Sequence, residues 1–342
     1  METFWFSMVA LMIAAYVILD GFDLGAGAIH LLVAKTNEER KAVLESIGPF
    51  WDGNEVWLLA AGGTLFFAFP VLYASSFQGF YLPLMLALWL LMARGLSIEL
   101  RNHLDAPMWR PLWDAGFCLS SSLLALVFGV ALGNVVRGVP LDDTHEFFLP
   151  LWTDWMPGRN PGILDWYTVT AGVTALAALT YHGALWITYK TEGDLCDRSA
   201  KLAKRLFFAV AGLTIVLSLM TYGVQPHTLD NFMAHPWGWI FPLTGAWGLV
   251  YAFAMTRGCN ERNAFFGSCT YLIGMLTSAA FGLFPYVLPS CVDPYASLTI
   301  WNATPTGYSL NVALAWWIPG MALAVGYFLF LYRRFSGKVQ LS

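Results

Sequence analysis

The sequence predicts an all-α integral membrane protein with nine transmembrane helices, built as one domain over residues 1–342. Only 12% of the residues are charged and 58% are hydrophobic, whereas soluble domains carry about 25% charged residues. The apolar residues gather in segments of about 20 residues or more, the length that crosses the hydrocarbon core of a bilayer. We therefore expect neither a separate soluble domain nor a nucleic-acid partner.

The predicted spans follow one another along the whole chain. They lie near residues 4–34, 53–74, 79–101, 111–136, 163–189, 203–224, 236–256, 263–286 and 307–332. After the first span, Thr36 and Glu39 have the spacing of a capping box. This pattern predicts a short surface helix at about 37–48.

The basic residues predict the orientation of the chain. Sixteen of the 18 Lys and Arg residues lie in or beside the connections after spans 1, 3, 5 and 7 and in the C-terminal tail. Only Arg137 and Arg159 lie in the opposite connections. Because basic residues favour the cytoplasmic side, we expect the N-terminus outside and the C-terminus and the surface helix in the cytoplasm. The long outer loops then lie at about 137–162 and 287–306.

Two carboxyl groups inside the first span are the strongest functional signal. Asp20 and Asp23 interrupt an otherwise apolar stretch, and a carboxylate at membrane depth costs about 2.5–3.5 kcal/mol on insertion scales. Residues three apart share one helix face. We expect the pair to face a protein interior and to handle protons or cations. The alternative is a structural pair that is hydrogen-bonded to a neighbouring helix.

A second pair of acids, Asp52 and Glu55, opens the second span at its cytoplasmic end with the same spacing. The short connection makes spans 1 and 2 neighbours, so the four acids predict a line of carboxyl groups from the cytoplasm toward mid-membrane. Carboxyl groups crowded in a low dielectric cannot all ionise and therefore share protons. A proton path needs this behaviour, although a cation site would use similar residues.

The third span ends with Arg94, Glu99 and Arg101. Arg94 lies inside the span and needs a partner, either Glu99 or an acid on another helix. We expect structural ion pairs here, with a functional role as the alternative. Asp114 begins the fourth span, where an acid complements the helix dipole.

The histidines and cysteines do not predict a redox centre or a metal site. Only His182 lies within a span, and no two of the six histidines are placed to clamp a haem at mid-membrane. The five cysteines have no metal-binding spacing. We expect His30 and His182 to be hydrogen-bonded interface residues and expect no firmly held cofactor in this chain.

The same stretches resemble subunit II of the cytochrome bd-type quinol oxidases. Asp20-Gly-Phe-Asp-Leu-Gly25 resembles the DGFD-hydrophobe-G segment of that family, and Trp51-Asp-Gly-Asn-Glu-Val-Trp57 resembles its WDGNxVW segment. Further matches are Ala61-Gly-Gly63, Phe80-Tyr81, the Arg94, Glu99 and Arg101 pattern, and Leu298-Thr-Ile-Trp-Asn-Ala303. The similarity runs from the first span to the C-terminus.

The resemblance implies a haem-free subunit that forms a heterodimer with a homologously folded subunit I. That partner carries the haems, b and d or b only, and the site of quinol oxidation. The complex, in the bacterial cytoplasmic membrane, oxidises quinol and reduces dioxygen to water with protons from the cytoplasm. It thereby serves aerobic electron transport and generates proton motive force. A structural quinone in this subunit and small accessory subunits are left open.

The resemblance also implies roles for individual residues. Asp20 and Asp52 match acids of a proton path toward the haem site of subunit I, and Asp23 belongs to the same motif. Trp57 matches a residue near a dioxygen route, with a structural role as the alternative. Glu55 stands where some relatives have Gln, so its role stays open.

Two other hypotheses compete with this one. A proton-coupled secondary transporter would use Asp20 and Asp23, but it predicts inverted repeats and broken helices, which are not clear in this sequence, and the odd number of spans fits it poorly. A purely structural subunit would use the acids only to hold an interface.

Overall fold

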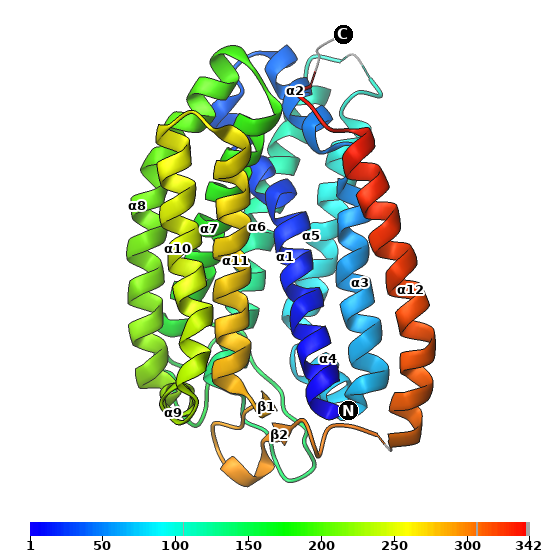
Figure 1. Cartoon of the computed structure of the whole chain (residues 1–342), viewed down its shortest axis with the longest axis vertical. Helices are drawn as coiled ribbons and strands as arrows, with labels where there is room; N and C mark the ends of the chain where they lie inside the picture. Colours follow the sequence, from blue (N-terminus) through cyan, green and yellow to red (C-terminus); the bar gives the residue numbers. More distant parts are fainter. Residues whose placement is uncertain (105, 306, 340–342) are drawn as a thin grey trace.

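Long helices that run roughly side by side make up most of the computed structural model, which describes residues 1–104, 106–305 and 307–339 (Figure 1). The long helices are α1 Glu2–Val33, α3 Trp51–Ala68, α5 Tyr81–Leu100, α6 Trp109–Arg137, α7 Trp166–Lys190, α8 Gly193–Val224, α10 Ile240–Arg257, α11 Glu261–Leu283 and α12 Gly307–Arg334. Each contains one of the predicted spans or most of it. The all-α prediction is confirmed.

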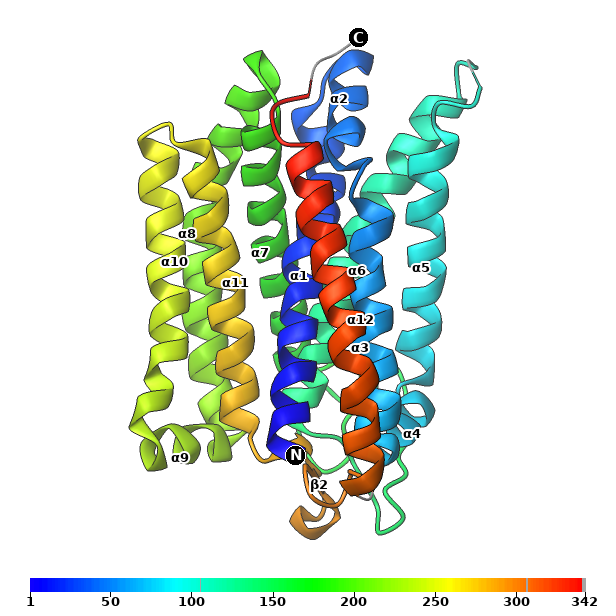
Figure 2. The same ribbon diagram turned by 45° about the vertical axis from the view of Figure 1, so that its right-hand side comes forward.

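Short elements close the two ends of the bundle. One end holds α2 (Asn37–Ile47) and the last turn of α12; the other holds the N-terminus, α4 (Pro70–Gly79) and α9 (Pro226–Ala234) (Figures 1 and 2). A small antiparallel hairpin, which the sequence did not predict, begins at Tyr286 and continues into the predicted outer loop at 287–306. Its elements are β1 Tyr286–Leu288, η2 Pro294–Ala296 and β2 Leu298–Thr299. Thr306, the last residue of that loop, lies outside the described residues.

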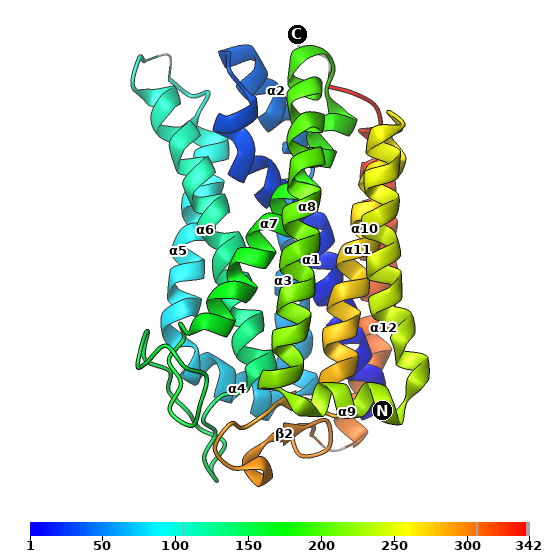
Figure 3. The same ribbon diagram turned by 90° about the vertical axis from the view of Figure 1, so that its left-hand side faces the viewer.

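Seven helices of the described chain are long and apolar enough to cross a membrane. They are α1, α5, α6, α8, α11, α12 and α10 with the preceding η1 (Pro236–Trp239). The bent pair of α3 and α4 makes an eighth if it counts as one span. Helix α7 is also long, but its Thr, Tyr and His side chains make it more polar. It packs against α1, α6, α8 and α11 (Figure 3), so it has little need of a lipid-facing apolar surface.

The prediction of one continuous helix over 53–74 is wrong, because the second span is broken into two helices. It ends at Ala68, and α4 begins at Pro70 after a bend of 120°. Proline disfavours helical backbone in the residue before it, and Phe69 has φ −136° and ψ 63°. The apolar pattern continues through this break, which is why composition alone suggested one span.

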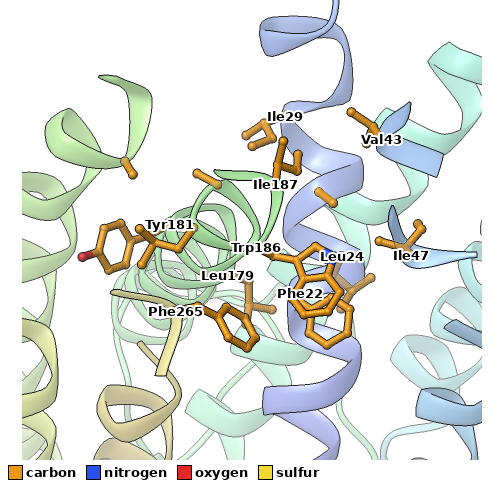
Figure 4. Close-up of a cluster of buried hydrophobic side chains, with 14 of the residues drawn as sticks. Phe22, Leu24, Ile29, Val43, Ile47, Leu179, Tyr181, Trp186, Ile187 and Phe265 are labelled. Carbon is orange, nitrogen blue, oxygen red and sulfur yellow. The ribbon is translucent and has the colours of Figure 1, made fainter. Parts of the chain in front are cut away.

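The core of the bundle depends on a close approach of α1 and α7. A Cβ atom on Gly25 would lie 1.9 Å from the carbonyl oxygen of Leu179, and one on Gly183 would lie 2.2 Å from the carbonyl carbon of Gly25. Beside this contact, Phe22 stacks on Trp186 with ring centroids 4.0 Å apart (Figure 4). Only glycines allow the two backbones to pack at this distance.

The predicted capping box at the start of α2 is confirmed. The Thr36 hydroxyl accepts the Glu39 amide at 3.3 Å, and the Glu39 carboxylate accepts the Lys35 and Thr36 amides. Arg198 of α8 donates to the same carboxylate. Partial burial raises the pKa of Glu39, but the amide and Arg198 hydrogen bonds outweigh it and leave the pKa below its ordinary value. The acid therefore stays ionised and ties α2 to α8.

We expect Gly25→Ala to destabilise the protein, because the added methyl group would meet the α7 backbone. Overpacking of this kind costs about 1–3 kcal/mol. The measurement is thermal unfolding of the purified protein. The control is Gly212→Ala on α8, where no atom lies within 4 Å of the new Cβ. Equal melting temperatures for Gly25→Ala and the wild type would contradict the proposed packing.

Candidate functional site

A buried ion-pair cluster joins α1, α3 and α5. Arg94 Nη1 donates to Asp20 Oδ2 at 3.0 Å, and Arg94 Nη2 lies 2.8 Å from Asp20 Oδ1. Arg94 Nη2 also donates to Glu55 Oε1. The Asp20 and Arg94 side chains are fully buried, whereas that of Glu55 is 26% exposed. One guanidinium is therefore shared by two carboxylates from two different helices.

Asp23 lies one turn along α1 from Asp20 and has a different partner. Asn54 Nδ2 donates to Asp23 Oδ2 at 2.8 Å and to the Leu19 carbonyl at 2.9 Å. The Tyr332 hydroxyl of α12 donates to Asn54 Oδ1 at 3.2 Å. Asn54 and Tyr332 are not among the residues that the sequence pattern singles out. Asn54 lies within the Trp51–Trp57 motif, but nothing in the sequence links it to a residue 278 positions away.

The four predicted acids differ in how far they lie from the surface. Asp52 is exposed in the first turn of α3, and Glu55, one turn deeper, is partly exposed. Asp20 and Asp23 are completely buried. The structure therefore brings Asp20, Asp23 and Glu55 together around Arg94 and Asn54. Asp52 stays at the surface of the chain, close to Glu55.

The suggestion that Glu99 partners Arg94 is wrong. Glu99 is exposed, and among the described residues no ion pair joins it to Arg94 or to Arg101. The reason is helical geometry. Five residues of α-helix turn through about 500°, so Glu99 lies roughly 140° around α5 from Arg94. The acids that pair with Arg94 come from other helices instead.

A second buried cluster surrounds Asp114 at the α2 end of the bundle. Arg101 contacts both carboxylate oxygens, with Nε 2.5 Å from Oδ1 and Nη2 3.2 Å from Oδ2. His30 Nε2 lies 2.8 Å from Oδ1, and Arg40 Nη1 lies 3.1 Å from Oδ2. Asp114 therefore joins α1, α2 and the end of α5 to α6, a wider role than complementing a helix dipole.

The remaining candidate residues make apolar or neutral contacts. Trp57 packs against Phe328 of α12, with ring centroids 5.6 Å apart. His182 is buried, with Nε2 2.9 Å from the Ile18 carbonyl and Nδ1 2.7 Å from Ser268 Oγ. Both of its ring nitrogens are therefore engaged in contacts between helices. Within the described part of the chain, no three His, Cys, Asp or Glu side chains form a metal-binding group.

The helix bundle and its buried charged clusters define a polytopic membrane protein. Residues 1–335 match the family model described as cytochrome bd terminal oxidase subunit II. The chain is 32% identical to the "Probable cytochrome oxidase subunit 2" of Haemophilus influenzae, over 98% of this chain and 94% of that protein. It is 31% identical to the "Cytochrome bd-I ubiquinol oxidase subunit 2" of Escherichia coli, over 90% and 87% of the two chains.

A solved structure has the same fold. The bd oxidase from Geobacillus thermodenitrificans contains a chain that matches with a TM-score of 0.75 and 17% identity, over 98% of both chains. The protein described here therefore belongs to the cytochrome bd terminal oxidase subunit II family. It is a subunit of a membrane quinol oxidase of the bacterial cytoplasmic membrane. This membership favours the oxidase hypothesis over the secondary transporter.

We expect Arg94→Met to destabilise the protein strongly, because it leaves Asp20 and Glu55 without their shared cation. Removing one partner of a buried ion pair typically costs about 3–5 kcal/mol. The matched control on the same helix is Glu99→Gln, for which we expect a change within about 0.5 kcal/mol. Yield and thermal unfolding of the two variants measure the difference. Similar stabilities would show that the buried cluster does not hold these helices.

Proposed function

We propose that this chain supplies protons from the cytoplasm for dioxygen reduction in a haem-bearing partner subunit and supports the assembly of that subunit. The observation that carries the proposal is Arg94, which bridges the partly exposed Glu55 to the fully buried Asp20. A carboxyl group that reaches the surface is thereby connected to one in the interior. The family implies that the haems lie in the partner subunit.

The proposed path begins at Asp52 and continues through Glu55 to Asp20. The exposed Asp52 accepts a proton in the first turn of α3. Glu55 lies one turn further along the same helix. Two carboxylates around one guanidinium leave one negative charge, which an incoming proton neutralises. Burial makes that neutralisation favourable, because unpaired charge is costly in a low dielectric.

The haems of the partner would supply the electron transfer and the reduction of dioxygen. The residues of this chain have a narrower task, which is to accept, hold and pass protons at carboxylate oxygens. Burial of Asp20 and Arg94 keeps bulk water from the inner end of the proposed proton path. For Trp57 we propose a place beside a dioxygen route, supported by its apolar contact with Phe328; a purely structural role is the alternative.

We further propose nine crossings, with the N-terminus outside and α2 and the C-terminus in the cytoplasm. The start of α1 and the end of α12 lie at opposite ends of the bundle (Figure 1), as an odd number of crossings requires. The distribution of 16 against two basic residues supports the orientation. Asp52 then lies toward the cytoplasmic end, where the proposed path must begin.

The cavity among five of the helices is small for a structural quinone. The cavity between α1, α6, α7, α8 and α11 has a volume of about 220 Å³. Small-molecule sites usually have about 300–1,000 Å³. Its lining is mainly apolar, with the Tyr16 and Tyr271 side chains among the polar contributors. This cavity therefore supplies no argument for a quinone in this chain.

We expect Asp20→Asn and Asp52→Asn to lower oxygen consumption of the assembled oxidase roughly tenfold or more, because Asn cannot accept a proton. The assay uses complexes purified with the partner subunit and with normal haem content, which separates turnover from assembly. The control is Asp194→Asn, which changes an exposed acid in the first turn of α8.

Full turnover and normal proton uptake in both Asp20→Asn and Asp52→Asn would contradict the proton path. It would leave the purely structural subunit as the better explanation. A variant that loses haem together with activity would instead assign that acid to assembly.

A further inference from the structure

Asp23 is the buried acid of the cluster that no cation neutralises in the part of the chain that the structure describes. Its side chain is completely buried. Oδ2 accepts one hydrogen bond, from Asn54 Nδ2 at 2.8 Å, and Oδ1 has no hydrogen-bond partner. The nearby Arg94 is occupied by Asp20 and Glu55. The two carboxylate oxygens of Asp23 are therefore held in different environments.

The orientation of the Asn54 amide follows from its partners. Its nitrogen contacts the Leu19 carbonyl at 2.9 Å as well as Asp23. A backbone carbonyl can only accept, so the nitrogen must face α1 and the oxygen must face away. That oxygen accepts the Tyr332 hydroxyl of α12. Asn54 thus offers Asp23 one neutral N–H and no charge.

This environment favours a protonated acid. A single neutral hydrogen bond stabilises far less than the burial of an unpaired carboxylate costs. A proton on Oδ1, the oxygen that lacks a donor, removes the charge and leaves the Asn54 hydrogen bond to Oδ2 intact. The charged and titratable groups facing Asp23 are Asp20 on α1, Glu55 on α3, Arg94 on α5 and Tyr332 on α12.

We propose that Asp23 is held as a neutral carboxylic acid and stores the proton of the path, with Asn54 and Tyr332 as its positioning residues. The inference rests on the proposed proton path. In the transfer step the O–H bond at Asp23 Oδ1 breaks and an O–H bond forms at the Asp20 carboxylate. Asp20 then releases its proton toward the partner subunit, and a proton arriving by way of Glu55 restores the O–H bond at Asp23. No electrons are exchanged in either step.

Tyr332 connects the hydrogen bonding of Asp23 to the last helix, α12, through Asn54. Few side chains of α12 are buried, namely Leu310, Phe328 and Leu331. Tyr332 adds the hydroxyl contact with Asn54, and its ring stacks on Phe50 with centroids 4.6 Å apart. Tyr332→Phe therefore keeps the ring stacking and removes only the hydroxyl. Asn54→Ser is the stronger change, because it also replaces the amide donor to Asp23 with a shorter hydroxyl group.

The test is infrared spectroscopy of the assembled complex in the carbonyl-stretch region of protonated carboxylic acids. Asp23→Asn should remove one band that the wild type shows. Asn54→Ser and Tyr332→Phe should keep that band but shift it, because they change the hydrogen bonding around the acid. The control is Tyr327→Phe, an exposed residue of the same helix, which should leave the band in place.

The inference is overturned if Asp23→Asn removes no such band, since Asp23 would then be ionised. It is also overturned if neither Asn54→Ser nor Tyr332→Phe moves the band, because neither residue would then position the acid. The infrared result is independent of turnover. If the band behaves as expected while Asp20→Asn and Asp52→Asn turn over normally, the proton path fails but the neutral state of Asp23 stands.

Discussion

The guanidinium of Arg94 is the interaction on which the arrangement of the first helices depends. It cannot stay buried without acids, and Asp20 cannot stay buried as a carboxylate without a cation. Because Glu55 shares the same group, the positions of α1, α3 and α5 are fixed together. The close contact of Gly25 with the α7 backbone then packs α7 against α1, the helix that carries Asp20.

The two buried clusters differ in their charge balance, and this difference separates structure from proposed function. Around Asp114, Arg101 and Arg40 contact one carboxylate, and the positive groups are in excess. Around Arg94 the acids are in excess. A cluster with surplus acid in a low dielectric must hold protons, whereas a cluster with surplus base has no such need. We therefore propose proton transfer for the Arg94 cluster and helix anchoring for the Asp114 cluster.

The sequence predicted the features that depend on local pattern. The apolar segments, the capping box at Thr36 and the acids Asp20 and Asp23 all follow from neighbouring residues. The sequence does not reveal the break before Pro70, because hydropathy continues through it. Of the two partners expected for Arg94, Glu99 is wrong because of its angle around α5, and an acid on another helix is confirmed. Asn54 and Tyr332 could not be paired, since their contact depends on how α12 returns to α3. Contacts between distant segments are a property of the fold.

The most direct test of the proton path measures proton uptake during a single turnover of the reduced oxidase with dioxygen. It compares the wild type, Asp20→Asn, Glu55→Gln and the double variant. Residues in one path should show strongly non-additive effects, so we expect the double variant to take up protons about as slowly as the slower single variant. Uptake at the wild-type rate in the double variant would contradict the account.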